Sequence, residues 1–301
     1  MIPAALAGCA ALLHLTTAWR YGYFRDELYF IACAKHLAWG YVDQPPLVAL
    51  AAFAAAPAGY HLIALRALPA LCAAGTVYLA VALTRRLGGG IFAQWLAGIA
   101  TLLMPAYLLL GNVLTTTSFE PFSWTLAIYA TVGIVLAPDK RRARWWLFLA
   151  AASAFGAYGK YSIALLVAAL VVGLVPTPQR AVLRSPWPLI AAAVATLLLA
   201  PNLIWQAGHG WPFVEVLRGD AAHRPAFASG VALEFTDLAR NAAAFAVEQI
   251  VYTNLLAAPL WLAGIVAPFR IAALRDLRFL SIAYCIVIVT AVSLSALSLI
   301  H

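Results

Sequence analysis

Long uninterrupted runs of hydrophobic residues dominate the chain, and shorter polar connections separate them. Most runs approach the roughly 20 residues that an α-helix needs to cross a bilayer. The runs fall at residues 2–19, 61–84, 91–110, 119–137, 144–159, 161–176, 186–204, 249–269 and 279–300. The pattern predicts an all-α polytopic membrane protein with about nine transmembrane helices. The first run lacks a basic flank and a clear cleavage site, so we expect a retained span and not a signal peptide.

Composition excludes several other classes of protein. Hydrophobic residues make up 65% of the 301 positions and charged residues only 10%, with a mean hydropathy of +0.91. A soluble domain of this length could not bury so much apolar surface, and a disordered chain would be far more polar. A membrane β-barrel would show short alternating strands. The four cysteines are scattered, without the spacing of a zinc site or a disulfide framework.

The net charge of +8 is distributed unevenly between alternate connections. One set of loops carries eleven basic residues and two acids, whereas the opposite set carries the other eight basic residues and nine acids. Short basic loops mark the cytoplasmic side. The charge therefore indicates topology and not nucleic-acid binding, and it places the N-terminus in the cytoplasm. We expect a multi-pass protein of the cell (inner) membrane.

Two connections are long, and both lie on the outer side in this topology. They cover residues 20–60 and 205–248, and most of the acids of the chain gather in them. In a chain with so few charges, carboxylates at the membrane surface indicate a functional site. No repeat or soluble domain interrupts the pattern, so residues 1–301 are expected to form a single transmembrane domain.

An acidic pair, Asp26 and Glu27, begins an aromatic-rich segment in the first of these loops, which we expect to form an interfacial helix. One interpretation is structural: Asp26 caps the helix and Glu27 interacts with its positive end. The other is chemical: one carboxylate accepts a proton from an acceptor nucleophile or orients it. The residues alone favour the cap, because such caps are common.

A third carboxylate, Asp43, precedes Gln44 and a Pro-Pro step at residues 45–46. Two prolines are suited to a helix start, so Asp43 could again serve as a cap. A divalent cation would be another way to hold two of the three carboxylates of this loop together.

The string RDELYFIACAKHLAWGYVDQPPL at residues 25–47 resembles the first outer loop of glycosyltransferase family 39. These membrane enzymes have the GT-C fold and include protein O-mannosyltransferases and the aminoarabinose transferase of lipid A. The resemblance continues through RALPAL (66–71), LTTTSFEP (114–121), GKYS (159–162) and PNLIWQAGHGWP (201–212). It covers about two thirds of the chain, and five segments in the same order make it specific.

The resemblance implies a catalytic role for Asp26, with Glu27 beside it. Asp43 matches an acid that helps to bind a divalent metal in some members, and His209 is a candidate to complete that site or to orient the acceptor. A lone loop histidine is more often only solvated. At Gln44 some members carry a basic residue, so this chain lacks one phosphate contact there.

The donor implied by the resemblance is a polyprenyl-phosphate sugar, whose phosphate leaves with the electrons of the broken bond and needs cationic stabilisation. Lys160 and Arg66 are the candidates, although a snorkelling lysine and an interfacial anchor explain them equally simply. Glu120 is expected to pair with Arg66 or Lys160, or to cap its helix. Asn202 also matches the family, without an assigned role.

The resemblance thus implies an inverting hexosyl- or pentosyltransferase that acts at the extracytoplasmic face on a lipid, glycan or protein acceptor. A transporter is the alternative from another class, but transporters usually place ionisable residues near the middle of the membrane. Family members are usually longer than this chain, so a truncated, non-catalytic member is a further alternative.

Overall fold

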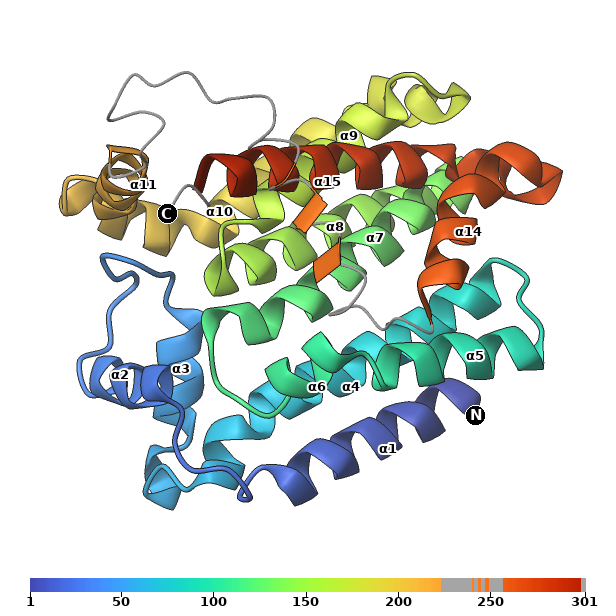
Figure 1. Ribbon diagram of the computed structural model, residues 1–301. Helices are drawn as coiled ribbons and strands as arrows, with labels where there is room; N and C mark the ends of the chain where they lie inside the picture. The colour runs from blue at the N-terminus through green and yellow to red at the C-terminus, as the bar shows by residue number, and fades with distance from the viewer. Residues whose placement is uncertain (223–239, 241–242, 245–246, 249–256, 299–301) are drawn as a thin grey trace.

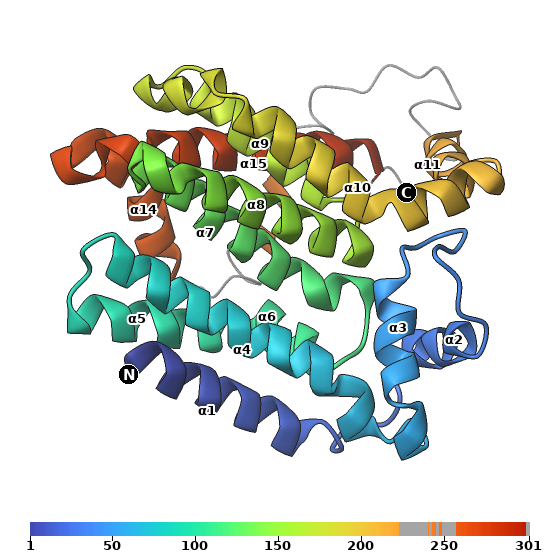
Figure 2. The same ribbon diagram turned by 180° about the vertical axis from the view of Figure 1, so that it is seen from behind.

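The computed structural model describes residues 1–222, 240, 243–244, 247–248 and 257–298, and every regular element in these residues is a helix. Figures 1 and 2 show a bundle of long helices that run roughly side by side, with short helices at one end. The elements are α1 (Ile2–Thr17), α2 (Arg25–Ala34), α3 (Leu47–Ala54), η1 (Ala56–Ala58), α4 (Leu62–Arg86), α5 (Ile91–Leu102), α6 (Pro105–Leu110), η2 (Thr116–Phe119), α7 (Glu120–Leu136), α8 (Asp139–Gly159), α9 (Ile163–Leu174), η3 (Pro178–Arg184), α10 (Trp187–Gly208), α11 (Pro212–Ala222), α14 (Ala258–Arg270), η5 (Ala272–Leu277) and α15 (Arg278–Ser298).

The all-α prediction is confirmed for these residues, and four helical segments are long and apolar enough to cross a membrane. They are Leu62–Arg86, Thr116–Leu136, Trp187–Gly208 and Ala272–Ser293. A fifth arises if α9 and η3, which meet at an angle of 117°, form one broken span. The count of nine spans stays a prediction, and part of the expected span 249–269 lies outside the described residues.

The expected span at 91–110 is not a single helix. It divides into α5 and α6 at Met104, which has an extended backbone and precedes Pro105. Proline disfavours a helical conformation in the residue before it, and this accounts for the break. The expected separation at Gly159 and Lys160 is confirmed, because α8 ends at Gly159 and α9 begins at Ile163.

Small and aliphatic side chains pack the bundle. The largest buried cluster joins α7, α8, α9 and α15, and Gly173 of α9 allows α15 to approach closely: a Cβ there would lie 2.5 Å from the carbonyl oxygen of Phe279. Close approach at small residues is typical of helices packed within membranes. On α10, by contrast, Leu197 and Ile204 are more than 70% exposed, as expected for a helix that faces lipid.

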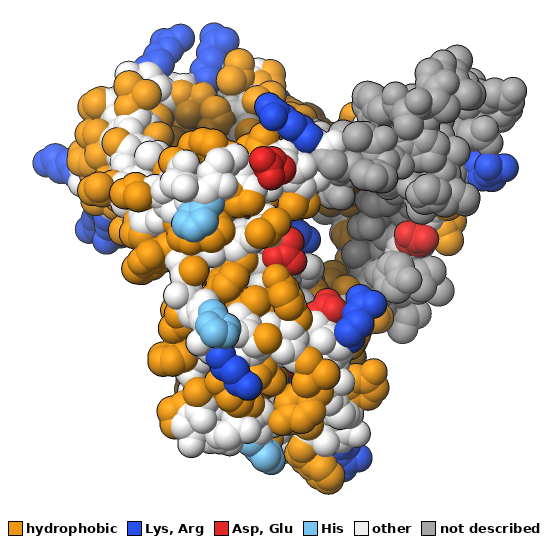
Figure 3. All heavy atoms as spheres, turned by 90° about the vertical axis from the view of Figure 1, so that its left-hand side faces the viewer, with side chains coloured by type: hydrophobic (Ala, Val, Ile, Leu, Met, Phe, Trp, Pro, Cys, Tyr) orange, Lys and Arg blue, Asp and Glu red, His pale blue; other side chains and the backbone are white. Residues whose placement is uncertain are grey.

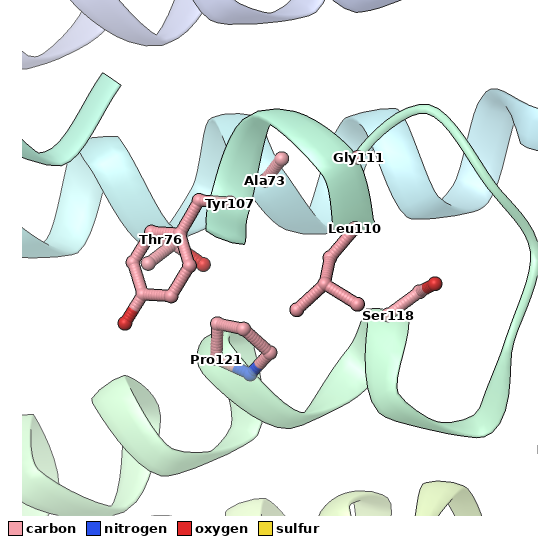
Figure 4. A pocket seen from close by; sticks show the side chains of 7 residues that line it. All are labelled: Ala73, Thr76, Tyr107, Leu110, Gly111, Ser118 and Pro121. Atoms are coloured by element: carbon pink, nitrogen blue, oxygen red, sulfur yellow. The ribbon is translucent and has the colours of Figure 1, made fainter. Parts of the chain in front are cut away.

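The interior between α4, α6 and α7 is closely packed. Figure 4 shows the small cavity there, with Thr76, Tyr107 and Pro121 around it. Its volume of about 10 Å³ is close to the minimum for a single water molecule. This cavity is therefore too small to hold an organic ligand.

The two ends of the bundle differ in charge. The turns between α4 and α5, between α9 and α10, and between α14 and α15 lie at one end with the N-terminus (Figures 1 and 2). These turns carry many of the basic residues predicted to face the cytoplasm. Helices α2 and α3 and the turn between α10 and α11 lie at the opposite end (Figures 1 and 2).

Candidate active site

The end of the bundle formed by α2, α3 and the turn after α10 contains the residues that the sequence singled out. Figure 3 views the molecule from this end, where carboxylate side chains lie along the middle of the face with basic and histidine side chains around them. The first outer loop contacts α10 directly, because a Cβ at Gly40 would lie 2.4 Å from the ring of Trp205. Segments far apart in the sequence thus meet here.

Glu27 and Arg66 form a buried ion pair under this face. Arg66 Nε and Nη2 donate to the two carboxylate oxygens of Glu27 at 2.8 and 2.7 Å, and the two side chains are at most 1% exposed. The remaining guanidinium hydrogens are used as well: Nη1 donates to the carbonyl oxygens of Ala18 and Tyr21, and Nη2 also donates to that of Gly22. The arginine of α4 therefore fixes the chain between α1 and α2.

The carboxylate oxygens of Glu27 likewise accept as many hydrogen bonds as they can. Besides Arg66, it accepts the backbone N–H of Phe24 at 2.8 Å and that of Leu114 at 2.9 Å. With two donors on each oxygen, no lone pair is left to take a proton, and all five donors of Arg66 are engaged. This geometry favours a positioning role for Glu27 and Arg66, and their expected roles in catalysis and in phosphate binding stay predictions.

Asp26 does not cap α2, contrary to the structural interpretation of the sequence. The helix begins at Arg25 with Phe24 as its N-cap residue, and the Phe24 N–H is satisfied by Glu27. The Asp26 carboxylate is 39% exposed and lies 3.2 Å from Nε of Arg25, whose side chain is almost entirely in solvent. Such an exposed pair contributes little to stability. Because it is exposed, the Asp26 carboxylate is accessible from solvent.

Asp43 lies next to α2 and not at the cap of α3, whose N-cap residue is Pro46. Its Oδ1 accepts a hydrogen bond of 2.9 Å from the hydroxyl of Tyr29. Burial first, and then this hydrogen bond and the charge of Asp43, raise the pKa of Tyr29 well above its ordinary value, so the phenol stays protonated and keeps donating. Gln44 is buried, with its amide 3.8 Å from the thiol of Cys33.

Lys160 and Glu120 form a second ion pair, which is only half-buried. Nζ of Lys160 lies 3.3 Å from Glu120 Oε2 and 3.3 Å from Thr117 Oγ1, and the lysine side chain is 44% exposed. Ser162 donates a short hydrogen bond to the other oxygen of Glu120. Of the partners considered for Glu120, the structure selects Lys160. Unlike Arg66, this lysine retains access to solvent and to an incoming anion.

Asn202 connects α10 to both neighbouring segments. Its side chain donates to the carbonyl of Trp39 at 2.7 Å and accepts from the hydroxyl of Tyr161 at 2.8 Å, and Gln206 donates to the same hydroxyl. Asn202 is buried, so these bonds replace those it would make to water. Tyr161 was not selected from the sequence as a site residue. Its position next to Lys160, in the turn after α8, could have indicated it.

His209 follows α10 and is exposed. Its ring stacks on Trp205 with 4.1 Å between centroids, and Nδ1 lies 2.7 Å from the carbonyl oxygen of Trp205. Within the part of the chain that the structure describes, no three His, Cys, Asp or Glu side chains gather closely enough to hold a metal ion. Asp43 and His209 therefore do not form a complete metal site among these residues.

These features define an all-helical membrane protein with a charged site at one end of the bundle. The sequence matches the family model described as dolichyl-phosphate-mannose-protein mannosyltransferase over residues 43–205, more than half of the chain. The chain belongs to this family of GT-C glycosyltransferases, glycosyltransferase family 39, whose members are membrane-embedded and use polyprenyl-phosphate-linked sugar donors. No curated protein and no solved structure matches the chain. The matched region includes Asp43, Arg66, Glu120 and Lys160 but begins after Asp26.

Proposed function

We propose that the protein transfers a sugar from a polyprenyl-phosphate donor to a hydroxyl group of an acceptor at the extracytoplasmic face of the cell membrane. The observation that carries this proposal is the presence of an accessible carboxylate, Asp26, and an accessible cation, Lys160, at the same end of a membrane-embedded bundle. Sugar transfer from a phosphate donor needs both groups: one for the acceptor proton and one for the leaving phosphate.

In the proposed reaction Asp26 accepts the proton of the acceptor hydroxyl while its oxygen attacks the anomeric carbon. The bond between that carbon and the phosphate oxygen breaks, and the leaving polyprenyl phosphate keeps the electron pair. A single displacement of this kind inverts the configuration at the anomeric carbon. Lys160 would exchange part of its contact with Glu120 for the phosphate, and Ser162 would keep Glu120 hydrogen-bonded meanwhile.

A divalent metal is a further proposal for Asp43 and His209. A metal bound there would add positive charge near the phosphate. Two protein ligands are enough only if substrate phosphate oxygens and water complete the coordination, which is common for Mg²⁺. The proton transfer and the displacement described above use side chains of the chain alone.

The orientation of the site is proposed from the distribution of charge. Basic turns lie at the end with the N-terminus, and the acid-rich loops lie at the other end. By the positive-inside rule the first end faces the cytoplasm. The proposed site then faces the opposite compartment, next to the leaflet in which the donor's phosphate would lie.

Cysteine labelling in intact cells tests this topology. In a background without the native cysteines, cysteines at Gly22 and Gly208 should react with an impermeant thiol reagent, whereas one at Lys140 should react only after lysis. Gly22 and Gly208 are exposed and have room for a side chain, and Lys140 is exposed in the first turn of α8, which begins at the other end of the bundle (Figure 1). Gly40 is avoided because a side chain there would collide with Trp205. Labelling of Lys140→Cys alone in intact cells would reverse the proposed orientation.

A transfer assay tests the function. Purified protein in lipid is given a polyprenyl-phosphate sugar and a panel of hydroxyl acceptors, and product is detected by mass. Lys160→Gln should raise KM for the donor at least about tenfold, because one charge-assisted contact to phosphate is lost. Its thermal stability should change little, since a half-exposed pair contributes about 1 kcal/mol or less. An unchanged donor KM would remove Lys160 from the phosphate site, and no transfer with any polyprenyl-phosphate sugar would refute the function.

A further inference from the structure

A second cavity lies at the opposite end of the bundle from the proposed active site. It has a volume of about 310 Å³. It is formed between α1, α4 and α7 and is lined by Pro3, Tyr78, Ala82, Arg85, Arg86 and Tyr129. Two guanidinium groups and two phenol groups thus surround a space far larger than one water molecule.

The α4 residues that line the cavity extend along the helix axis, from the end of the helix toward its middle. Ala82 follows Tyr78 by four residues, and Arg85 and Arg86 follow Ala82 by three and four residues, so each lies on the same side of the helix as Ala82. With 25 residues, α4 is about 37 Å long, longer than the roughly 30 Å of a bilayer's hydrocarbon core. Its last residues, the two arginines, reach headgroup depth, and Tyr78 lies about 10 Å deeper.

Arg86 is held in place by aromatic rings. Its guanidinium lies 4.2 Å from the ring centroid of Trp145 and 5.3 Å from that of Tyr129. In the described residues neither Arg85 nor Arg86 forms an ion pair, and Nη1 of Arg86 has no hydrogen-bond partner there. The two positive charges next to the cavity are therefore not neutralised by any described carboxylate.

We propose that this cavity binds the phosphodiester headgroup of an anionic phospholipid from the leaflet on the basic side. Arginine pairs with phosphate oxygens through two parallel hydrogen bonds, and the tyrosine hydroxyls can add further ones. Basic pockets between helices on the cytoplasmic side are suited to anionic lipid headgroups. The part of the wall formed by Ala82 and the Tyr78 ring, which lies deeper than the arginines along α4, would lie against the apolar part of the lipid, which favours a lipid over a free anion.

Native mass spectrometry of the full chain in neutral detergent tests the proposal. Phosphatidylglycerol should bind in preference to phosphatidylcholine, and the double variant Arg85→Gln/Arg86→Gln should weaken that binding about thirtyfold, for the loss of two arginines near the surface. The control is Arg180→Gln/Arg184→Gln, which removes the same charge from exposed positions of η3 at the same end. The control should bind phosphatidylglycerol as the unchanged protein does.

Two results would overturn the proposal. An equal loss of binding in the control would indicate general charge attraction and no specific site. Displacement of the lipid by millimolar inorganic phosphate would indicate that the cavity binds a free anion. If the double variant does not fold, Arg85→Gln alone serves, because Arg85 is exposed; undiminished lipid binding in this variant would equally contradict the proposal.

Discussion

Asp26→Asn is expected to abolish sugar transfer while leaving the fold intact. The amide keeps the size and the acceptor oxygen of the side chain but loses the charge that would take the acceptor's proton. Loss of a general base typically lowers the rate by about a hundred- to ten-thousand-fold. Stability should hardly change, because the Asp26 carboxylate makes one exposed contact with Arg25 and does not cap α2. The measurement is the transfer rate, together with the melting temperature of the purified variant.

The control for this variant is Asp139→Asn, which removes an exposed carboxylate that pairs with the partly buried Arg142 at the other end of the bundle. It should keep full activity. An Asp26→Asn protein that retains most of its rate would exclude Asp26 as the base and transfer that proposed role to Asp43. A protein that loses both activity and melting temperature would indicate a structural role for Asp26.

The hydrophobic pattern was sufficient to predict where several long helices lie. The runs at 61–84, 186–204 and 279–300 correspond to α4, α10 and α15, because an uninterrupted apolar stretch in a membrane must satisfy its backbone internally. Pro105 was also visible in the sequence, but its effect on the run at 91–110 was missed. Hydrophobicity averaged along a run does not register a single residue that breaks the helix.

The arrangement of the charged residues was harder to predict. Asp26 and Glu27 are neighbours in sequence, yet a helix directs adjacent side chains about 100° apart, so one is accessible and the other is buried. Arg66 and Glu27 are 39 positions apart, and only tertiary packing brings them together. A lone arginine in an apolar run must find a partner; the sequence suggested a donor phosphate, and the structure supplies a carboxylate of the chain.

Glu27→Gln should therefore destabilise the protein severely instead of only slowing the reaction. It leaves the Arg66 charge buried without its counter-ion, and breaking a buried pair in this way costs about 3–5 kcal/mol. The contacts at risk hold the start of α2, the end of α1 and the backbone of Leu114. The expected result is a large drop in melting temperature, with loss of folded protein in detergent. Glu215→Gln, at an exposed position of α11, should melt as the unchanged protein does.

The double variant Glu27→Met/Arg66→Met distinguishes the contribution of the two charges to stability from that of their hydrogen bonds to the backbone. Removing both charges avoids the cost of an unpaired ion, so its destabilisation should be smaller than the sum of the two single changes. It should not vanish, because the carbonyl groups of Ala18, Tyr21 and Gly22 and the N–H groups of Phe24 and Leu114 lose their partners. A Glu27→Gln protein that folds normally but cannot transfer sugar would contradict the positioning role and restore Glu27 as a catalytic carboxylate.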